Sequence, residues 1–361
     1  MIYELIISLH LIAILTIVIR KNQSKRIQFI EPDYVTQIKG FAIMLIIFAH
    51  LVQANFINLP LWRFTGAYGV AIFLLISGYG LTESYKKDSS LINYFIKRFK
   101  KVLLPFSIVT FSWIMLFNIN LSPRDLILNL IGLSFKNPVD GSMWYISFIL
   151  IWYSVFWIVF KLPIRDVLKI LLIFLVAYVL KSQPFDYFTI SENISFQYKL
   201  NTYMFPLGIL ISLYIPKFIE IMSTKVFNIL ILIINIGLIL TYKTTFASIL
   251  VDNNYGITCF IFALISLNVF IIFNSFGLKL RMLTFIGAIS YEIYLFEDVF
   301  IGRFPLISVF KSKWQSLILY VFVVVALSYI LKYTVKFLLS WNKQGLSREL
   351  DLTNDVMSKS I

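Results

Sequence analysis

The sequence predicts an all-α, polytopic membrane protein, a bundle of about eleven transmembrane helices. Of its 361 residues, 59% are hydrophobic and only 14% are charged, whereas about 25% of the residues in a soluble domain are charged. Apolar runs of roughly 20 residues recur from end to end. Each run is long enough to cross a hydrocarbon core of about 30 Å, so the lipid bilayer is the expected environment of the whole chain.

The expected spans are the apolar runs between charged residues and breaks that contain proline or glycine. They lie near residues 2–19, 37–54, 65–83, 102–119, 143–160, 166–180, 200–215, 224–242, 255–274, 282–301 and 315–338. Their ends are expected to shift by several residues. We therefore expect one transmembrane domain over residues 1–340, followed by a polar, disordered cytoplasmic tail over residues 341–361.

The distribution of charge predicts the orientation. The first apolar run has no basic residues before it and no small-residue cleavage signal, so we expect a retained anchor with the N-terminus outside. Eleven spans then put the C-terminus in the cytoplasm, together with 23 of the 32 basic residues, as the positive-inside rule requires. Topology thus explains the net charge of +14, and nucleic acid is not expected as a partner. No metal cofactor is expected either.

The stretch "KGFAIMLIIFAHL" places Lys39 and His50 eleven residues apart in one predicted span. Eleven helical residues turn about 20° past three full turns and rise roughly 16 Å. The two side chains therefore share a face, with the lysine at the cytoplasmic rim and the histidine near mid-membrane. Ionisable groups at that depth usually face a polar cavity and serve a function. A histidine that hydrogen-bonds between packed helices is the structural alternative.

A second cationic feature lies in "YFIKRFKKVLLPF", where Arg98 and Lys101 are three residues apart. With Lys97 they can form one ridge at the cytoplasmic end of a helix. Such a ridge suits a phosphate-rich ligand, because Arg and Lys bind phosphate oxygens through charge-assisted hydrogen bonds. A positive-inside anchor that touches anionic lipid is the alternative.

The stretch "GAYGVAIFLLISGYGLTESY" is rich in small residues that let helices approach closely. These residues are Gly66, Gly69, Ser77, Gly78 and Gly80. Ser77 could also hydrogen-bond a catalytic group or a substrate.

Two carboxylates, Glu292 and Glu297, fall inside one predicted span. Counted along a continuous helix from Arg281 at its inner edge, Glu292 is at the depth of His50 and Glu297 lies about 7 Å further out. The two side chains point in nearly opposite directions, so only one is expected to face His50. A carboxylate bonded to one imidazole nitrogen would fix the tautomer and raise the basicity of the other nitrogen. A carboxyl group that is protonated or paired elsewhere is the alternative.

These features occur together in an order that resembles the membrane acyltransferase type 3 family. The similarity covers most of the chain, from about residue 34 to residue 335. It rests on the basic residue eleven positions before a histidine, and on "FLLISGYG", "KRFKKVLLP", "SMWYISFILIWY" and "ISYEIYLFED".

The resemblance implies a ten-helix core preceded here by one N-terminal helix. It implies transfer of an acyl group, usually acetyl, from cytoplasmic acyl-CoA to a hydroxyl of a cell-envelope glycan or its lipid-linked precursor. His50 matches the family's catalytic histidine. Lys39 matches the arginine of the same motif, and Arg98 and Lys101 match a pair of arginines, so these cations, with Ser77, are the expected donor-binding residues. Glu292 and Glu297 are the expected catalytic partners.

The chain departs from the family pattern at four positions. Lysine replaces arginine at Lys39 and Lys101, which keeps the charge and loses bidentate phosphate recognition. Thr36 stands where an acidic residue is expected, and Glu297 where a second histidine is expected. Two other functions remain open: a transporter with His50 and Glu292 on a proton or ion path, and a non-enzymatic component of a glycan assembly complex. The oligomeric state is also open, a homo-oligomer included.

Overall fold

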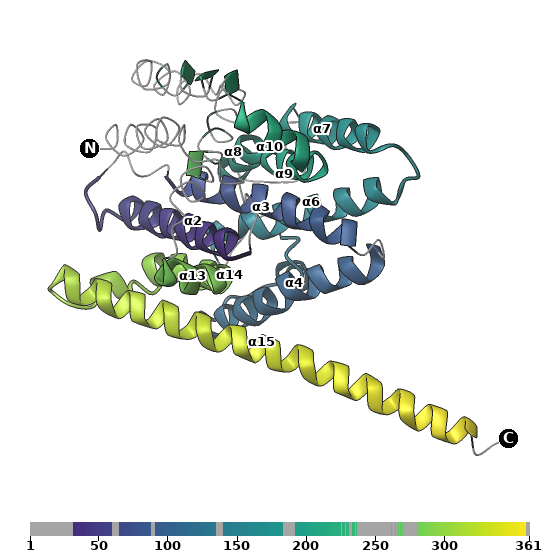
Figure 1. The fold of residues 1–361 in the computed structure, drawn as a ribbon. Helices are drawn as coiled ribbons and strands as arrows, with labels where there is room; N and C mark the ends of the chain where they lie inside the picture. Colours follow the sequence, from purple (N-terminus) through teal and green to yellow (C-terminus); the bar gives the residue numbers. More distant parts are fainter. Residues whose placement is uncertain are drawn as a thin grey trace.

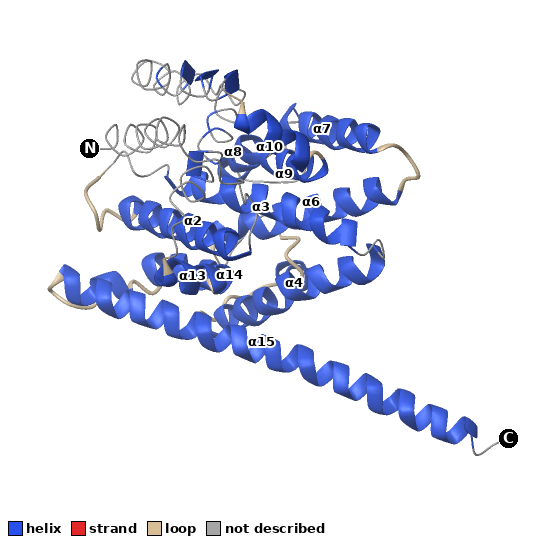
Figure 2. Cartoon of the chain, in the orientation of Figure 1, coloured by secondary structure: helices blue, strands red, loops and turns tan. Residues whose placement is uncertain are grey.

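The computed structural model describes residues 32–59, 65–87, 91–134, 140–182, 192–224 and 280–358, with isolated positions between 226 and 269. All regular structure within these residues is helical (Figures 1 and 2). The elements are α2 (Pro32–Gln53), α3 (Thr65–Lys87), α4 (Leu91–Leu116), α5 (Pro123–Leu130), η3 (Gly141–Met143), α6 (Trp144–Lys161), α7 (Asp166–Ser182), α8 (Glu192–Asn201), α9 (Met204–Leu213), α10 (Ile215–Ser223), α13 (Arg281–Ala288), α14 (Ser290–Gly302), η5 (Leu306–Ser308) and α15 (Lys313–Ser358).

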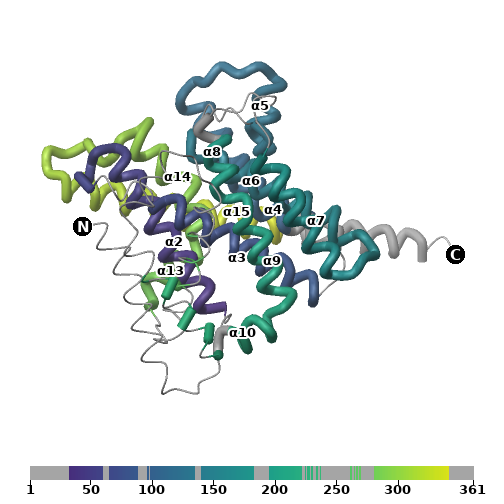
Figure 3. The backbone as a smooth tube through the Cα atoms, turned by 90° about the horizontal axis from the view of Figure 1, so that it is seen from above, coloured from purple at the N-terminus to yellow at the C-terminus, as the bar shows by residue number. Residues whose placement is uncertain are grey.

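The centre of the bundle is a row of helices in direct contact. Helix α3 packs between α2 and α9, and α2 packs on its other side against α13 and α14. Figure 3 shows α13, α2, α3 and α9 side by side when the bundle is seen from above. Helix α15 packs against α14 along one side of the bundle (Figure 1). The row holds α2, which carries Lys39 and His50, between α3 and α14.

Glycines bring the helices of this row into backbone contact. A Cβ on Gly78 of α3 would overlap the carbonyl oxygen of Phe205 in α9, and a Cβ on Gly69 would overlap that of Ala42 in α2. The predicted close approach is therefore confirmed at these two positions. It is wrong at Gly80, where a Cβ would meet no described atom within 4 Å.

Gly78 and Gly80 thus give a matched pair on one helix. We expect Gly78→Ala to lower the free energy of unfolding by about 1–3 kcal/mol, because α9 must move away. Gly80→Ala should leave it unchanged or raise it by about 0.5–1 kcal/mol, since alanine is the better helix former. Thermal melting of the detergent-solubilised protein measures both. Equal melting temperatures for the two variants would contradict this packing.

Five helices of the described residues are long and apolar enough to cross a membrane: Pro32–Gln53, Thr65–Lys87, Arg98–Leu116, Gly141–Lys161 and Lys313–Ser340. A sixth arises if Ser195–Leu213 and Ile215–Ile221, which meet at an angle of 92°, form one span. The predicted span 2–19 lies outside the described residues, as do most of 224–242 and 255–274. The protein is thus an all-α, multi-pass membrane protein, and the count of eleven spans stays a prediction.

The predicted span 282–301 is interrupted. It comprises α13 and α14, which are separated by Ile289 (φ −114°, ψ 15°). The carbonyl oxygen of Ala288, which would accept from Glu292 in a continuous helix, accepts instead from the Lys332 ammonium of α15 at 2.7 Å. A tertiary contact therefore helps to break a helix that the apolar pattern predicts to be continuous.

Two other segments differ from prediction. The span 200–215 is divided among α8, α9 and α10, with Pro216 at the start of α10, where proline favours a new first turn. The tail expected to be disordered from residue 341 is helical as far as Ser358. After Lys313 the chain has no proline and one glycine, so no strong helix breaker ends α15.

Candidate active site

Helix α2 presents both residues of the opening motif. Lys39 lies one to two turns after the start of the helix, and His50 lies in its last turn. His50 therefore lies near the end of its helix. The expected cation and imidazole are nevertheless on one helix, near opposite ends.

His50 forms a close pair with Glu297 of α14. The Nδ1 atom of His50 is 2.7 Å from one carboxylate oxygen of Glu297 and 2.9 Å from the other. The Glu297 side chain is fully buried, whereas the His50 side chain is 17% exposed. With the carboxylate ionised, Nδ1–H donates, and Nε2 carries the lone pair that can act on a substrate.

The α14 tyrosines hold this helix in register with its neighbours. The Tyr291 hydroxyl donates to the carbonyl oxygen of Val102 in α4 at 2.7 Å. The Tyr294 hydroxyl donates to the carbonyl oxygen of Ser142 in η3. These two anchors come from the same turn of α14 that leads to Glu297, so they limit how far its carboxylate can move from His50.

Glu292 lies elsewhere. It points away from His50, and the charge of Lys332 in α15 acts on it. The sequence put Glu292 at the depth of His50 and Glu297 further out, whereas Glu297 is the residue that contacts His50. The break at Ile289 invalidates a depth counted from Arg281 along one continuous helix. Of the two glutamates, the one paired with His50 in the described residues is Glu297.

A cavity of about 150 Å³ lies beside α2. Three of the four predicted donor-binding residues line it, namely Lys39, Ser77 and Arg98. The other lining residues are Ile46, Val70, Phe73, Val102, Tyr145, Ile149, Tyr153, Ser290, Tyr291 and Tyr294. One space thus combines two cations, a set of hydroxyl groups and an apolar wall, and α14 contributes to both this space and the His50 pair.

The fourth predicted donor-binding residue, Lys101, does not line the cavity. It is exposed on α4, within electrostatic range of Lys39, as is Arg98. Lys39 itself is half-buried. The three cations therefore lie near one another, although only Lys39 and Arg98 line the cavity.

A family model described as an acyltransferase domain matches residues 33–335. The chain belongs to the membrane acyltransferase type 3 family. No curated protein and no solved structure matches it. The motifs that suggested the family come together in space, because "FLLISGYG", "KRFKKVLLP", "SMWYISFILIWY" and "ISYEIYLFED" each contribute a residue to the cavity of this acyltransferase.

Glu297 departs from the pattern of the family at the position next to His50. This position, where a second histidine was expected, is the one that contacts His50. The acyltransferase therefore places a carboxylate, and not an imidazole, against its central histidine. An ionised carboxylate can only accept a hydrogen bond, so the nitrogen that faces it, Nδ1, must carry the proton, and one tautomer of His50 is imposed.

Sequence reasoning missed part of the site. It did not single out Asp140 or Asp298, although Asp298 Oδ1 lies 3.6 Å from His50 Nδ1. Tyr145 and Tyr153, which were not expected in the site either, line the cavity. Their spacing of eight residues, with Ile149 midway, puts all three on one helix face. That spacing was a usable signal for the cavity wall. Within the described residues, no group of three or more His, Cys, Asp or Glu side chains is arranged to hold a metal ion.

Proposed function

We propose that this acyltransferase moves an acyl group, most simply acetyl, from acyl-CoA to a hydroxyl of a cell-envelope glycan or its lipid-linked precursor. The proposal rests on the positions of two residues of α2. Its Lys39 lines a cavity with Arg98, and its His50 is paired with Glu297. Eleven helical residues separate the two by roughly 16 Å.

The cationic end suits the phosphates of the coenzyme. Arg98 offers a planar fork for a phosphate, and Lys39 and Lys101 add point charges. From there the apolar wall and hydroxyl groups of the cavity would accompany the pantetheine arm. The thioester would then lie toward His50, so that donor binding and chemistry occupy opposite ends of one helix.

The His50–Glu297 pair suits general-base catalysis. Nε2 takes the proton of the acceptor hydroxyl as its oxygen attacks the thioester carbonyl carbon. The new C–O bond forms, the C–S bond breaks, and the proton passes from the imidazolium to the departing thiolate. Glu297 keeps Nδ1 protonated and stabilises the imidazolium. Holding both reactants in a water-poor cavity supplies much of the rate.

The proposed orientation determines the side of the membrane from which each substrate binds. With the N-terminus outside, Lys39 faces the cytoplasm, where acyl-CoA is available, and His50 lies toward the outer face. The acceptor would approach His50 from that face. An acyl group would thus cross most of the membrane on its donor, without a free intermediate.

Labelled acetyl-CoA tests this function directly. Membranes that contain the protein are expected to transfer label into envelope glycan as an ester that mild alkali releases. Membranes from the same cells without the protein should not. An equal amount of ester label in both preparations, or none in either, would contradict the proposal.

A second prediction concerns the donor. We expect Arg98→Gln to raise the KM for acetyl-CoA about tenfold to a hundredfold, because a charge-assisted contact with phosphate is lost. The maximal rate should change little. Lys100→Gln is the matched control, since Lys100 is exposed on the same helix and does not line the cavity. A KM that responds equally to both changes would assign the effect to net surface charge.

A further inference from the structure

Asp298 is a carboxylate beside His50 that the His50–Glu297 pair does not need. Its Oδ1 lies 3.6 Å from His50 Nδ1, which is too long for a hydrogen bond. Both oxygens of Glu297 are closer to the same nitrogen, at 2.7 and 2.9 Å. The two carboxylates also differ in access, because the Asp298 side chain is 31% exposed and that of Glu297 is fully buried. Asp298 can therefore reach a substrate.

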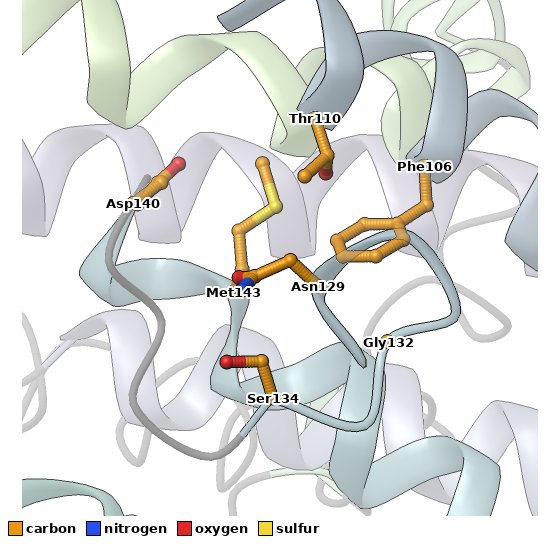
Figure 4. Close-up of a pocket in the computed structure, with 7 residues that line it drawn as sticks. All are labelled: Phe106, Thr110, Asn129, Gly132, Ser134, Asp140 and Met143. Carbon is orange, nitrogen blue, oxygen red and sulfur yellow. The ribbon is translucent and has the colours of Figure 1, made fainter. Parts of the chain in front are cut away.

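Asp140 lies behind Asp298. It is 6% exposed, and its Oδ1 accepts from the backbone N–H of Ser142 at 2.7 Å. Its Oδ2 is buried, and its side chain also interacts with Asp298 through a hydrogen bond. Asp140 lines a small pocket together with Thr110, Asn129 and Met143 (Figure 4). The Asp298 carboxyl group lies within range to act on it electrostatically.

The two acidic side chains differ in their environment. Burial raises the pKa of Asp140 well above its usual range, and the neighbouring Asp298 raises it further. The buried Asp140 carboxyl group lies close to that of Asp298, whose side chain is 31% exposed.

A purely structural role explains this arrangement poorly. The charge of one imidazolium is already matched by Glu297, which contacts it directly. A second carboxylate next to it adds unbalanced negative charge in a largely apolar protein. A ligand that donates a hydrogen bond to Asp298 would offset that cost.

We propose that Asp298, positioned by Asp140, binds the acceptor by accepting a hydrogen bond from a hydroxyl next to the one that reacts. The acceptor class is a polyol with neighbouring hydroxyls, such as a sugar ring with a free diol. An ionised carboxylate only accepts, and its O–H···O⁻ bonds are short and strong. His50 Nε2 acts on one hydroxyl while Asp298 holds its neighbour, which orients the attacking oxygen. This inference rests on the proposed transfer to a glycan.

The test uses the full-length, detergent-solubilised protein with saturating labelled acetyl-CoA and increasing amounts of extracted envelope glycan. We expect Asp298→Asn to raise the half-saturating glycan concentration about tenfold to a hundredfold. The maximal rate should stay close to that of the wild type. Asp125→Asn makes the same chemical change at an exposed position of α5 and should alter neither quantity.

Asp140 provides the second arm of the test. Asp140→Ala is expected to raise the half-saturating glycan concentration as Asp298→Asn does. Asp140→Asn keeps an acceptor for the Ser142 N–H and a donor toward Asp298, so it should restore most of the wild-type affinity. If the Asp140→Ala variant does not fold, the Asp298→Asn variant alone tests the inference.

Two results would overturn the inference: unchanged glycan saturation in Asp298→Asn, or a fall in maximal rate without a change in saturation. The second would mean that Asp298 acts through His50. Failure of the proposed function is a separate result, because the wild-type protein itself would then transfer no label to glycan.

Discussion

Replacement of His50 with alanine is expected to lower acyl transfer by on the order of 10²–10⁴-fold, the usual contribution of a positioned general base. The variant loses the Nε2 lone pair and leaves Glu297 buried without its partner. Ester label in glycan from labelled acetyl-CoA measures the loss. Size-exclusion chromatography in detergent shows whether the variant remains folded.

His10→Ala is the control for this experiment, because the chain has only two histidines. It should transfer label at the wild-type rate. Unchanged transfer by a folded His50→Ala variant would remove His50 from the mechanism. Label that stays on the wild-type protein before it reaches glycan, and is absent from His50→Ala, would instead indicate that the imidazole carries the acyl group.

Replacement of Glu297 with glutamine is expected to reduce transfer by about a hundredfold or more, with little change in the KM for acetyl-CoA. Glutamine has nearly the same shape, but it no longer stabilises the imidazolium or imposes the Nδ1–H tautomer. Changes of this kind cost on the order of 10⁴-fold in the Ser-His-Asp hydrolases. Initial rates at saturating acetyl-CoA measure the effect.

Glu292→Gln is the matched control on the same helix. Glu292 is not paired with His50. The rate of acyl transfer by the Glu292→Gln variant should therefore stay within about threefold of the wild-type rate, because changes remote from the reacting groups have small effects. A loss as large as that of Glu297→Gln would mean that the two carboxylates act together. It would then count against the assignment of Glu297 as the partner of His50.

The site could be predicted only where it depends on the geometry of one helix. The spacing of Lys39 and His50 fixes their shared face, and the spacing within α14 fixes the opposed directions of Glu292 and Glu297. Both results need only the helical repeat. The choice between the two glutamates needed the break at Ile289, to which Lys332 contributes by bonding the Ala288 carbonyl from a helix over 40 residues away. No local pattern contains that contact.

The sequence by itself determined that this is an all-helical membrane protein of the type 3 acyltransferase family, because apolar length, charge bias and ordered motifs are properties of the chain. Tertiary structure alone decided that Glu297 meets His50, that Arg98 and Lys39 line one cavity, and that Asp140 faces Asp298. The physical reason is that these pairs come from different helices. Their distances depend on where glycines let backbones touch and on where helices break.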